Sequence, residues 1–214
     1  IGKFEGSNQI TLAEGHKEAG EEGMTSRVLV ITGGPGTGKT TLVRAIITAA
    51  EQHDLKVHLM APTGRAAKRL ALASHMDADT IHKALEAEKR EDGRTVFSRD
   101  ESDPLEEDLI IVDEASMMDI SLFYHLLSAL KEDARLILVG DVDQLPPVGP
   151  GTPWKSIIAW EKVPVTRLKH IFRQKEGSGI IENAALIREG NMCVPDEGGE
   201  FKILPVWSEE EAFD

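Results

Sequence analysis

The sequence predicts an α/β fold in which a parallel sheet carries helices on both faces. Two observations lead to this prediction. Short runs of Val, Ile and Leu alternate with longer stretches of helical periodicity, as in chains where strands and helices follow one another. These runs are continuously apolar, which is typical of strands that are buried on both faces.

The expected elements follow in order along the chain. The expected strands are residues 27–31, 56–60, 109–112, 136–139 and 163–168. The expected helices are residues 39–52, 64–73, 80–89, 118–130, 152–159 and 179–189, with a possible strand at 201–206. Asp92 and Gly93 beside a short β-type run predict a hairpin. The hairpin is either a tolerated loop insertion or an accessory element that touches a ligand.

Composition narrows the class of protein. The 214 residues carry a net charge of −13 and a single cysteine, Cys193, so an internal disulfide is impossible and a reducing, cytoplasmic location is expected. No apolar run approaches the roughly 18 residues that span a bilayer, so no membrane partner is expected. Because proteins that bind nucleic acid through bulk charge are usually basic, any contact of this acidic chain with DNA must be local.

A glycine-rich segment of the pattern G-x-x-x-x-G-K-[ST] runs from Gly33 to Thr40, between an apolar run and a helical one. In that context the pattern predicts a loop whose backbone N–H groups cradle the phosphates of a nucleoside triphosphate at a helix N-terminus. Lys39 would reach the β- and γ-phosphates, and Thr40 would ligate Mg²⁺. The residues expected to contact the nucleotide are Gly34, Pro35, Gly36, Thr37, Gly38, Lys39, Thr40 and Thr41.

Polar residues follow two of the other apolar runs. Asp113 and Glu114 follow residues 109–112, and ligands of such folds sit at the carboxyl ends of parallel strands. We expect Asp113 to hold Mg²⁺ and Glu114 to act as general base, although acids also commonly begin helices. Gln144 follows residues 136–139, and its amide both donates and accepts, which suits a sensor of the γ-phosphate.

In their order along the chain, these segments resemble the motifs of superfamily 1 DNA helicases of the RecD type. The matching segments are residues 33–40 (motif I), 61–70 (motif Ia), 80–82 (the short motif that follows), 113–119 (motif II), 140–151 (motif III) and 168–174 (motif IV). The resemblance implies a P-loop NTPase of the RecA-like kind, the first motor domain of such a helicase. The stiff, proline-rich segment 145–151 would transmit a change at the phosphate to a surface, or it simply joins a strand to a helix.

The resemblance also implies an activity. It implies ATP hydrolysis coupled to 5′-to-3′ movement on single-stranded DNA, at a DNA fork, in DNA repair and recombination, with RecB- and RecC-like subunits or none. Arg173 would be an arginine finger, and Gln9 would read the adenine. The implied DNA contacts are Pro62, Thr63, Arg65, His82 and Pro147. Lys68 and Arg69 share a helix face with Arg65, and a solvated basic face is the alternative for these two.

The resemblance further predicts how the chain is divided. Residues 1–25 would be a flank, residues 26–190 the motor domain, and residues 191–214 the start of a connection to a second RecA-like domain whose motifs the sequence does not show. An insertion at about residues 88–107 would carry a duplex-splitting pin. With only half of such a site, the chain should bind Mg-ATP weakly and should not unwind DNA. Two alternative functions are the helicase half of a conjugative relaxase and a nucleotide-gated, non-catalytic module of a recombination complex.

Overall fold

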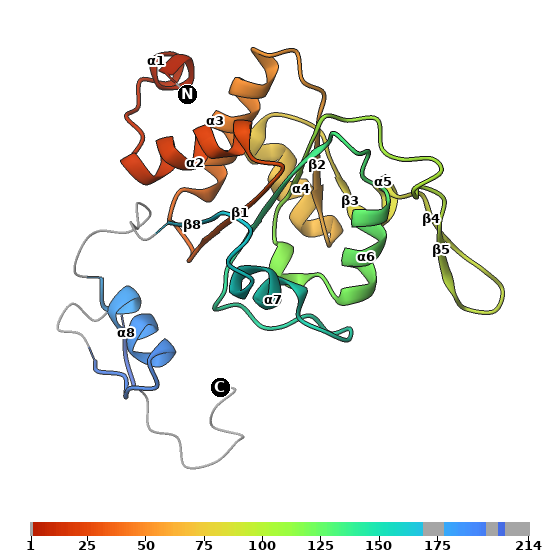
Figure 1. Ribbon diagram of the computed structural model, residues 1–214. Coiled ribbons are helices and arrows are strands. Elements are labelled where there is room, and N and C mark those ends of the chain that lie inside the picture. Colours follow the sequence, from red (N-terminus) through yellow and green to blue (C-terminus); the bar gives the residue numbers. More distant parts are fainter. Residues whose placement is uncertain (1, 169–177, 196–200, 204–214) are drawn as a thin grey trace. The chain divides into compact units, whose positions relative to one another are not determined.

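The computed structural model describes residues 2–168, 178–195 and 201–203, and within the first of these ranges six parallel strands form one sheet (Figure 1). The strands lie in the order β3-β2-β6-β7-β1-β8. They are β1 (Val28–Gly33), β2 (Val57–Ala61), β3 (Ala78–Thr80), β6 (Leu109–Val112), β7 (Arg135–Gly140) and β8 (Val165–Leu168). The parallel α/β fold is thus confirmed, and every strand except β3 coincides with an expected apolar run.

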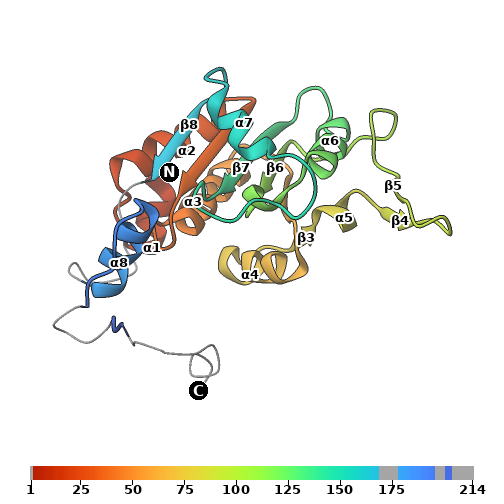
Figure 2. The ribbon, with the colours of Figure 1, turned by 90° about the horizontal axis from the view of Figure 1, so that it is seen from below.

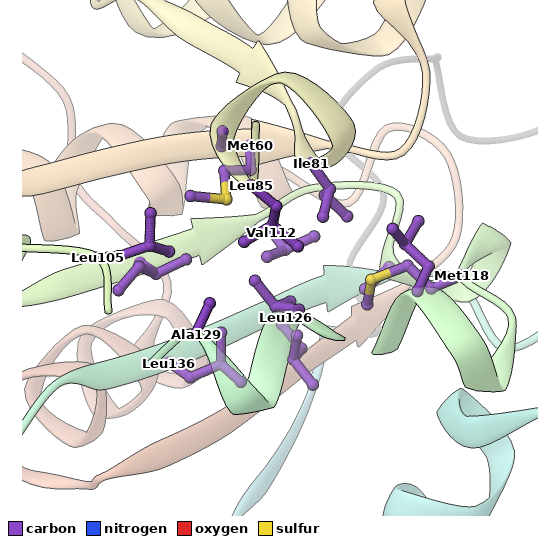
Figure 3. Packing of buried hydrophobic residues seen from close by; sticks show 14 of the residues in the cluster. Met60, Ile81, Leu85, Leu105, Val112, Met118, Leu126, Ala129 and Leu136 are labelled. Atoms are coloured by element: carbon purple, nitrogen blue, oxygen red, sulfur yellow. The ribbon is translucent and has the colours of Figure 1, made fainter. Parts of the chain in front are cut away.

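Helices cover both faces of the sheet (Figures 1 and 2). One face packs against α2 (Glu14–Thr25), α3 (Lys39–Glu51) and α4 (Gly64–Ser74). The other packs against α5 (Ile81–Ala84), the 3-10 turn η1 (Ala115–Met117), α6 (Ile120–Ser128) and α7 (Pro153–Ala159). Figure 3 shows the second layer, in which Val112 of the sheet lies near Leu126 of α6. Since all four residues of β6 are buried, the strand is apolar throughout.

Within the N-terminal stretch 1–25, expected to be a flank, residues 2–25 contain two helices, and both contribute buried side chains. Phe4 of α1 (Gly2–Asn8) packs with Leu12 and with Ala45 of α3. In α2, a Cβ added at Gly23 would lie 3.0 Å from Ile137 Cδ1, so the glycine lets the helix approach the sheet closely. A compact unit spans Ile1–Ile171, and a second spans Phe172–Asp214 and contains α8 (Gly179–Arg188).

The prediction of a helix at residues 80–89 is wrong beyond the first turn. The helix α5 ends at Ala84, because the next carbonyl, that of Leu85, accepts from the backbone N–H groups of Ser98 and Arg99. The chain then forms the expected hairpin from β4 (Ala87–Lys89) and β5 (Thr95–Phe97), which projects from the body of the unit beside α5 (Figures 1 and 2). Gly93 lies in its turn with φ of +82°.

Two further expectations concern the possible C-terminal strand and the absence of a membrane-spanning segment. Residues 201–203 of the possible C-terminal strand are not in a strand, and residues 204–206 lie outside the described residues. Among the described helices, none combines the length and the apolarity needed to cross a membrane.

Candidate nucleotide and nucleic-acid site

The glycine-rich loop joins the end of β1 to the start of α3. Gly36 and Gly38 have φ of +77° and +83°, in the left-handed region that favours glycine. Gly38 is the N-cap of α3, so the loop turns directly into the helix N-terminus. Thr37 closes the turn because its Oγ1 donates to the Gly34 carbonyl at 2.9 Å. This backbone geometry matches an anion cradle.

The close packing around Gly33 predicts that even a methyl group there is costly. A Cβ at this position would lie 2.6 Å from Thr37 Oγ1 and 2.8 Å from the backbone carbonyl of Leu168, and the latter belongs to β8. We expect Gly33→Ala to lower the free energy of unfolding by about 1–3 kcal/mol and to weaken nucleotide binding. Urea denaturation and nucleotide titration measure the two effects. Gly64→Ala is the control, since a Cβ there meets nothing within 4 Å, and equal losses in both variants would contradict this account.

Lys39, the first residue of α3, folds its side chain back over the loop. Its Nζ donates to the carbonyl oxygens of Gly33 at 2.6 Å and Gly34 at 3.0 Å. Burial lowers the pKa of this amine, whereas the negative charges of Asp141, Asp113 and Glu114 oppose that shift. The three carboxylates follow β6 and β7, so the carboxyl ends of these strands and the loop form one electrostatic site.

Two residues of this site were missed by sequence reasoning. Asp141, directly after β7, is buried, and its Oδ1 accepts from the Asp143 backbone N–H at 3.0 Å. His16 of α2 is buried too, and its Nε2 lies 3.0 Å from the Thr37 carbonyl oxygen. Because a carbonyl oxygen only accepts hydrogen bonds, Nε2 carries the hydrogen and donates it to Thr37. This hydrogen bond links α2 to the glycine-rich loop. The position of Asp141 after an apolar run could have indicated it, whereas His16 stands in a Gly- and Glu-rich stretch without a recognisable motif.

Asp113 is placed where a cation would be favourable. Burial raises the pKa of its carboxyl, while the backbone N–H of Glu114, which donates to Oδ1 at 2.9 Å, lowers it. Among the described residues, no cluster of three or more His, Cys, Asp or Glu side chains is arranged to hold a metal ion. A magnesium ion here would therefore rely on Asp113, the Thr40 hydroxyl and phosphate oxygens, which are the hard ligands that it prefers.

The carboxylate of Glu114 is held from two sides. Arg69 of α4 forms an ion pair with Oε1, and Gln144 Nε2 donates to Oε2 at 3.0 Å. Gln144 in turn accepts from Ser116 Oγ at 3.4 Å. Glu114 itself has φ of +54°, an uncommon conformation for a non-glycine residue that directs it away from the helical path. Thus Arg69, which was expected to share a helix face with Arg65, contacts the Glu114 carboxylate.

The remaining expected nucleotide residues are placed as follows. Thr40 and Thr41 lie in the first turn of α3. Gln9 is exposed in the turn after α1 with φ of +51°, and the preceding Asn8 accepts a hydrogen bond from Arg44 of α3 at 3.1 Å. Arg173 lies outside the described residues.

A groove of about 1020 Å³ lies next to this site. Four of the five expected DNA contacts line it, namely Pro62, Thr63, His82 and Pro147, whereas Arg65 is exposed on α4 and is not among the lining residues. The hairpin contributes Arg94, Thr95 and Phe97 to the wall.

Two aromatic rings that sequence reasoning missed, those of Phe97 and His125, also line the groove, beside the expected His82. The ring of Phe97 lies with its centroid 4.4 Å from that of His125 and 5.8 Å from that of His82. These rings come from β5, α6 and α5, so only the fold brings them together. Planar side chains beside a groove suit the stacking of nucleobases.

Comparison with known proteins identifies similar chains. Residues 16–150 match a family model described as an AAA domain. The chain is 42% identical over 158 residues to the ATP-dependent RecD2 DNA helicase of Deinococcus radiodurans, covering 74% of this chain and 21% of that protein. It is 39% identical over 165 residues to the RecBCD enzyme subunit RecD of Mycobacterium tuberculosis, covering 66% of this chain and 28% of the relative. Each relative is therefore much longer than the region matched.

A solved structure is similar as well. The crystal structure of the Pif1 helicase from Candida albicans superposes with a TM-score of 0.64 at 26% identity, over 88% of this chain and 46% of that one. The similarity extends beyond the glycine-rich loop to most of the sheet and its helices.

Proposed function

This chain belongs to the AAA domain family and is a RecD-type superfamily 1 motor domain, and from that premise we propose that it couples ATP hydrolysis to 5′-to-3′ movement along single-stranded DNA. The loop amides and Lys39 bind the triphosphate, and Asp113 with Thr40 holds Mg²⁺. Glu114 takes the proton of the attacking water. In the same proposal Arg173 is the arginine finger and Gln9 reads the adenine, both supported by the family resemblance.

The position of Gln144 is the observation that carries the proposal. Its side chain lines the groove and also donates to Glu114. One residue therefore contacts both the acid that would activate water and the surface where DNA would lie. Through Gln144, loss of the γ-phosphate can change the position of residues that line the groove, and a motor requires such coupling between ATP hydrolysis and DNA.

The groove supports single-stranded DNA as the partner, with the hairpin at the fork. Local contacts are available despite the net charge of −13, since Arg94 and the rings of Phe97 and His125 lie together. Because the mycobacterial relative is named a subunit of the RecBCD enzyme, RecB- and RecC-like subunits are the candidate protein partners. Co-purification of the native protein would reveal such subunits.

ATP hydrolysis by the full-length gene product, measured with and without single-stranded DNA, tests the proposal. A motor predicts that DNA raises the steady-state rate several-fold and that movement displaces a blocking group from the 3′ end of the strand. A rate that does not respond to DNA, with tight nucleotide binding retained, would instead support the nucleotide-gated module.

Arg94 offers a separate test of the groove. We expect Arg94→Ala to weaken single-stranded DNA binding and to reduce the slope of log affinity against log salt by about 0.7, as for one lost phosphate contact. Fluorescence anisotropy at several salt concentrations measures both. Lys89→Ala is the matched control, because Lys89 lies on the same hairpin but not among the residues that line the groove. If both variants changed DNA affinity and its salt dependence equally, the hairpin would contribute only non-specific electrostatic attraction, and Arg94 would make no specific contact in the groove.

A further inference from the structure

The ion pair between Arg69 and Glu114 joins two parts of the molecule that would carry different ligands. Arg69 belongs to α4, and Glu114 follows β6. The Arg69 side chain is 66% exposed, whereas that of Glu114 is 16% exposed. The arginine can therefore leave for another partner at little cost, while the glutamate stays in place.

The helix α4 leads directly from this ion pair to the groove. Thr63, its N-cap, accepts from the Ala66 backbone N–H and lines the groove together with Pro62. Arg69 lies six residues further along the same helix, about 9 Å of helical rise away. Since a capped helix moves as a rigid element, a ligand that shifts Thr63 also shifts Arg69.

Both oxygens of Glu114 are engaged in this arrangement. Oε1 faces the guanidinium of Arg69, and Oε2 accepts from Gln144. A general base must come within hydrogen-bond reach of the proton that it removes. A water molecule at the γ-phosphate would compete with a charge-assisted hydrogen bond for this carboxylate.

We propose that Arg69 restrains Glu114 in the DNA-free protein, and that single-stranded DNA in the groove draws α4 and Arg69 away and frees the carboxylate for catalysis. The inference rests on the proposed function and adds a regulatory role for Arg69 to it. Arg69 is thus a positioning residue: it acts through Glu114 and keeps ATP hydrolysis low until DNA is bound.

ATP hydrolysis by full-length Arg69→Ala, with and without oligo-dT, tests the restraint. We expect kcat without DNA to rise about two- to fivefold, the range for loss of one largely exposed ion pair, with KM for ATP unchanged and a smaller stimulation by DNA. Arg69→Lys, which keeps a cation, should restore part of the restraint. Lys89→Ala removes a positive charge from β4 of the hairpin, outside the residues that line the groove, and should leave the DNA-free rate unchanged.

The outcomes separate the restraint from the proposed function. Unchanged DNA-free hydrolysis in Arg69→Ala, or an equal loss of activity with and without DNA, would overturn the restraint. Arg69→Gln, which removes the charge but keeps a polar side chain of good helix propensity, decides the matter should the alanine variant not fold. Glu114→Gln in otherwise unchanged protein tests the proposed function. If ATP hydrolysis does not depend on Glu114, both the proposed function and the restraint by Arg69 lose their basis.

Discussion

Replacing Glu114 with glutamine is expected to lower kcat for ATP hydrolysis by about 10²–10⁴-fold while nucleotide affinity changes little. Glutamine keeps the size of the side chain and can still accept from Gln144, but it can no longer take a proton from water. Lys39 and the loop amides, which would bind the phosphates, are unchanged. Steady-state hydrolysis and titration with a fluorescent ATP analogue measure the two quantities.

Glu106→Gln is the matched control for this variant. Glu106 precedes β6, at the opposite end of the strand from Glu114, and its exposed carboxylate lies 3.8 Å from Lys56. Its substitution removes the same charge and should leave kcat unchanged. Full activity in Glu114→Gln, or a loss of nucleotide binding that accounts for its inactivity, would remove Glu114 from the role of general base.

The largest expected effect on stability is that of Ile111→Ala. Ile111 is fully buried in β6, opposite Leu59 of β2 and Ile137 of β7, and it belongs to the core cluster that includes α3. Removing its side chain leaves a cavity and should lower the free energy of unfolding by about 2–5 kcal/mol. That loss is a large share of the 5–15 kcal/mol typical of a domain. Urea unfolding with an unchanged m-value would measure it.

Leu72→Ala provides the comparison for the core variant. Leu72 lies on α4 and is 79% exposed, so its truncation should change the free energy of unfolding by less than about 0.5 kcal/mol. Similar losses at the two positions would mean that the sheet is not the packed centre of the unit.

The strands could be predicted because both of their faces are buried. That burial makes most of β1, β6 and β7 continuous apolar runs, and such runs are visible in the sequence, whereas the run in β2 is interrupted by the half-buried His58. The strand β3 has only three residues, Ala78–Thr80, none of them fully buried, so it carries no such pattern. Its pairing with β2 depends on neighbours that are distant in sequence.

The N-terminal helix α2 escaped prediction for a different reason. Its buried positions include Ala19, Gly20 and Gly23, small residues that make close contact rather than a large apolar stripe. Glycine lowers helix propensity, so the segment reads as irregular until the packing against Ile137 is known. Tertiary contact thus outweighs local preference here.

The candidate site was predictable where a strand end or a loop pattern defines it. Asp113, Glu114 and Gln144 follow apolar runs, and the parallel sheet brings them to one edge. The contact of Arg69 with Glu114 depends on how α4 is rotated, and the ring cluster of Phe97 and His125 depends on how the hairpin meets α6. Neither the rotation of α4 nor the packing of the hairpin against α6 leaves a pattern in the sequence.

A crystal structure of the protein with Mg²⁺ and a non-hydrolysable ATP analogue tests the central claim most directly. We predict phosphates within the loop from Gly34 to Thr40, Lys39 turned from the loop carbonyls to the γ-phosphate, and Asp113 beside the metal ion. A nucleotide bound elsewhere, or a metal ion on the loop with Asp113 remote from it, would contradict the assignment of this site.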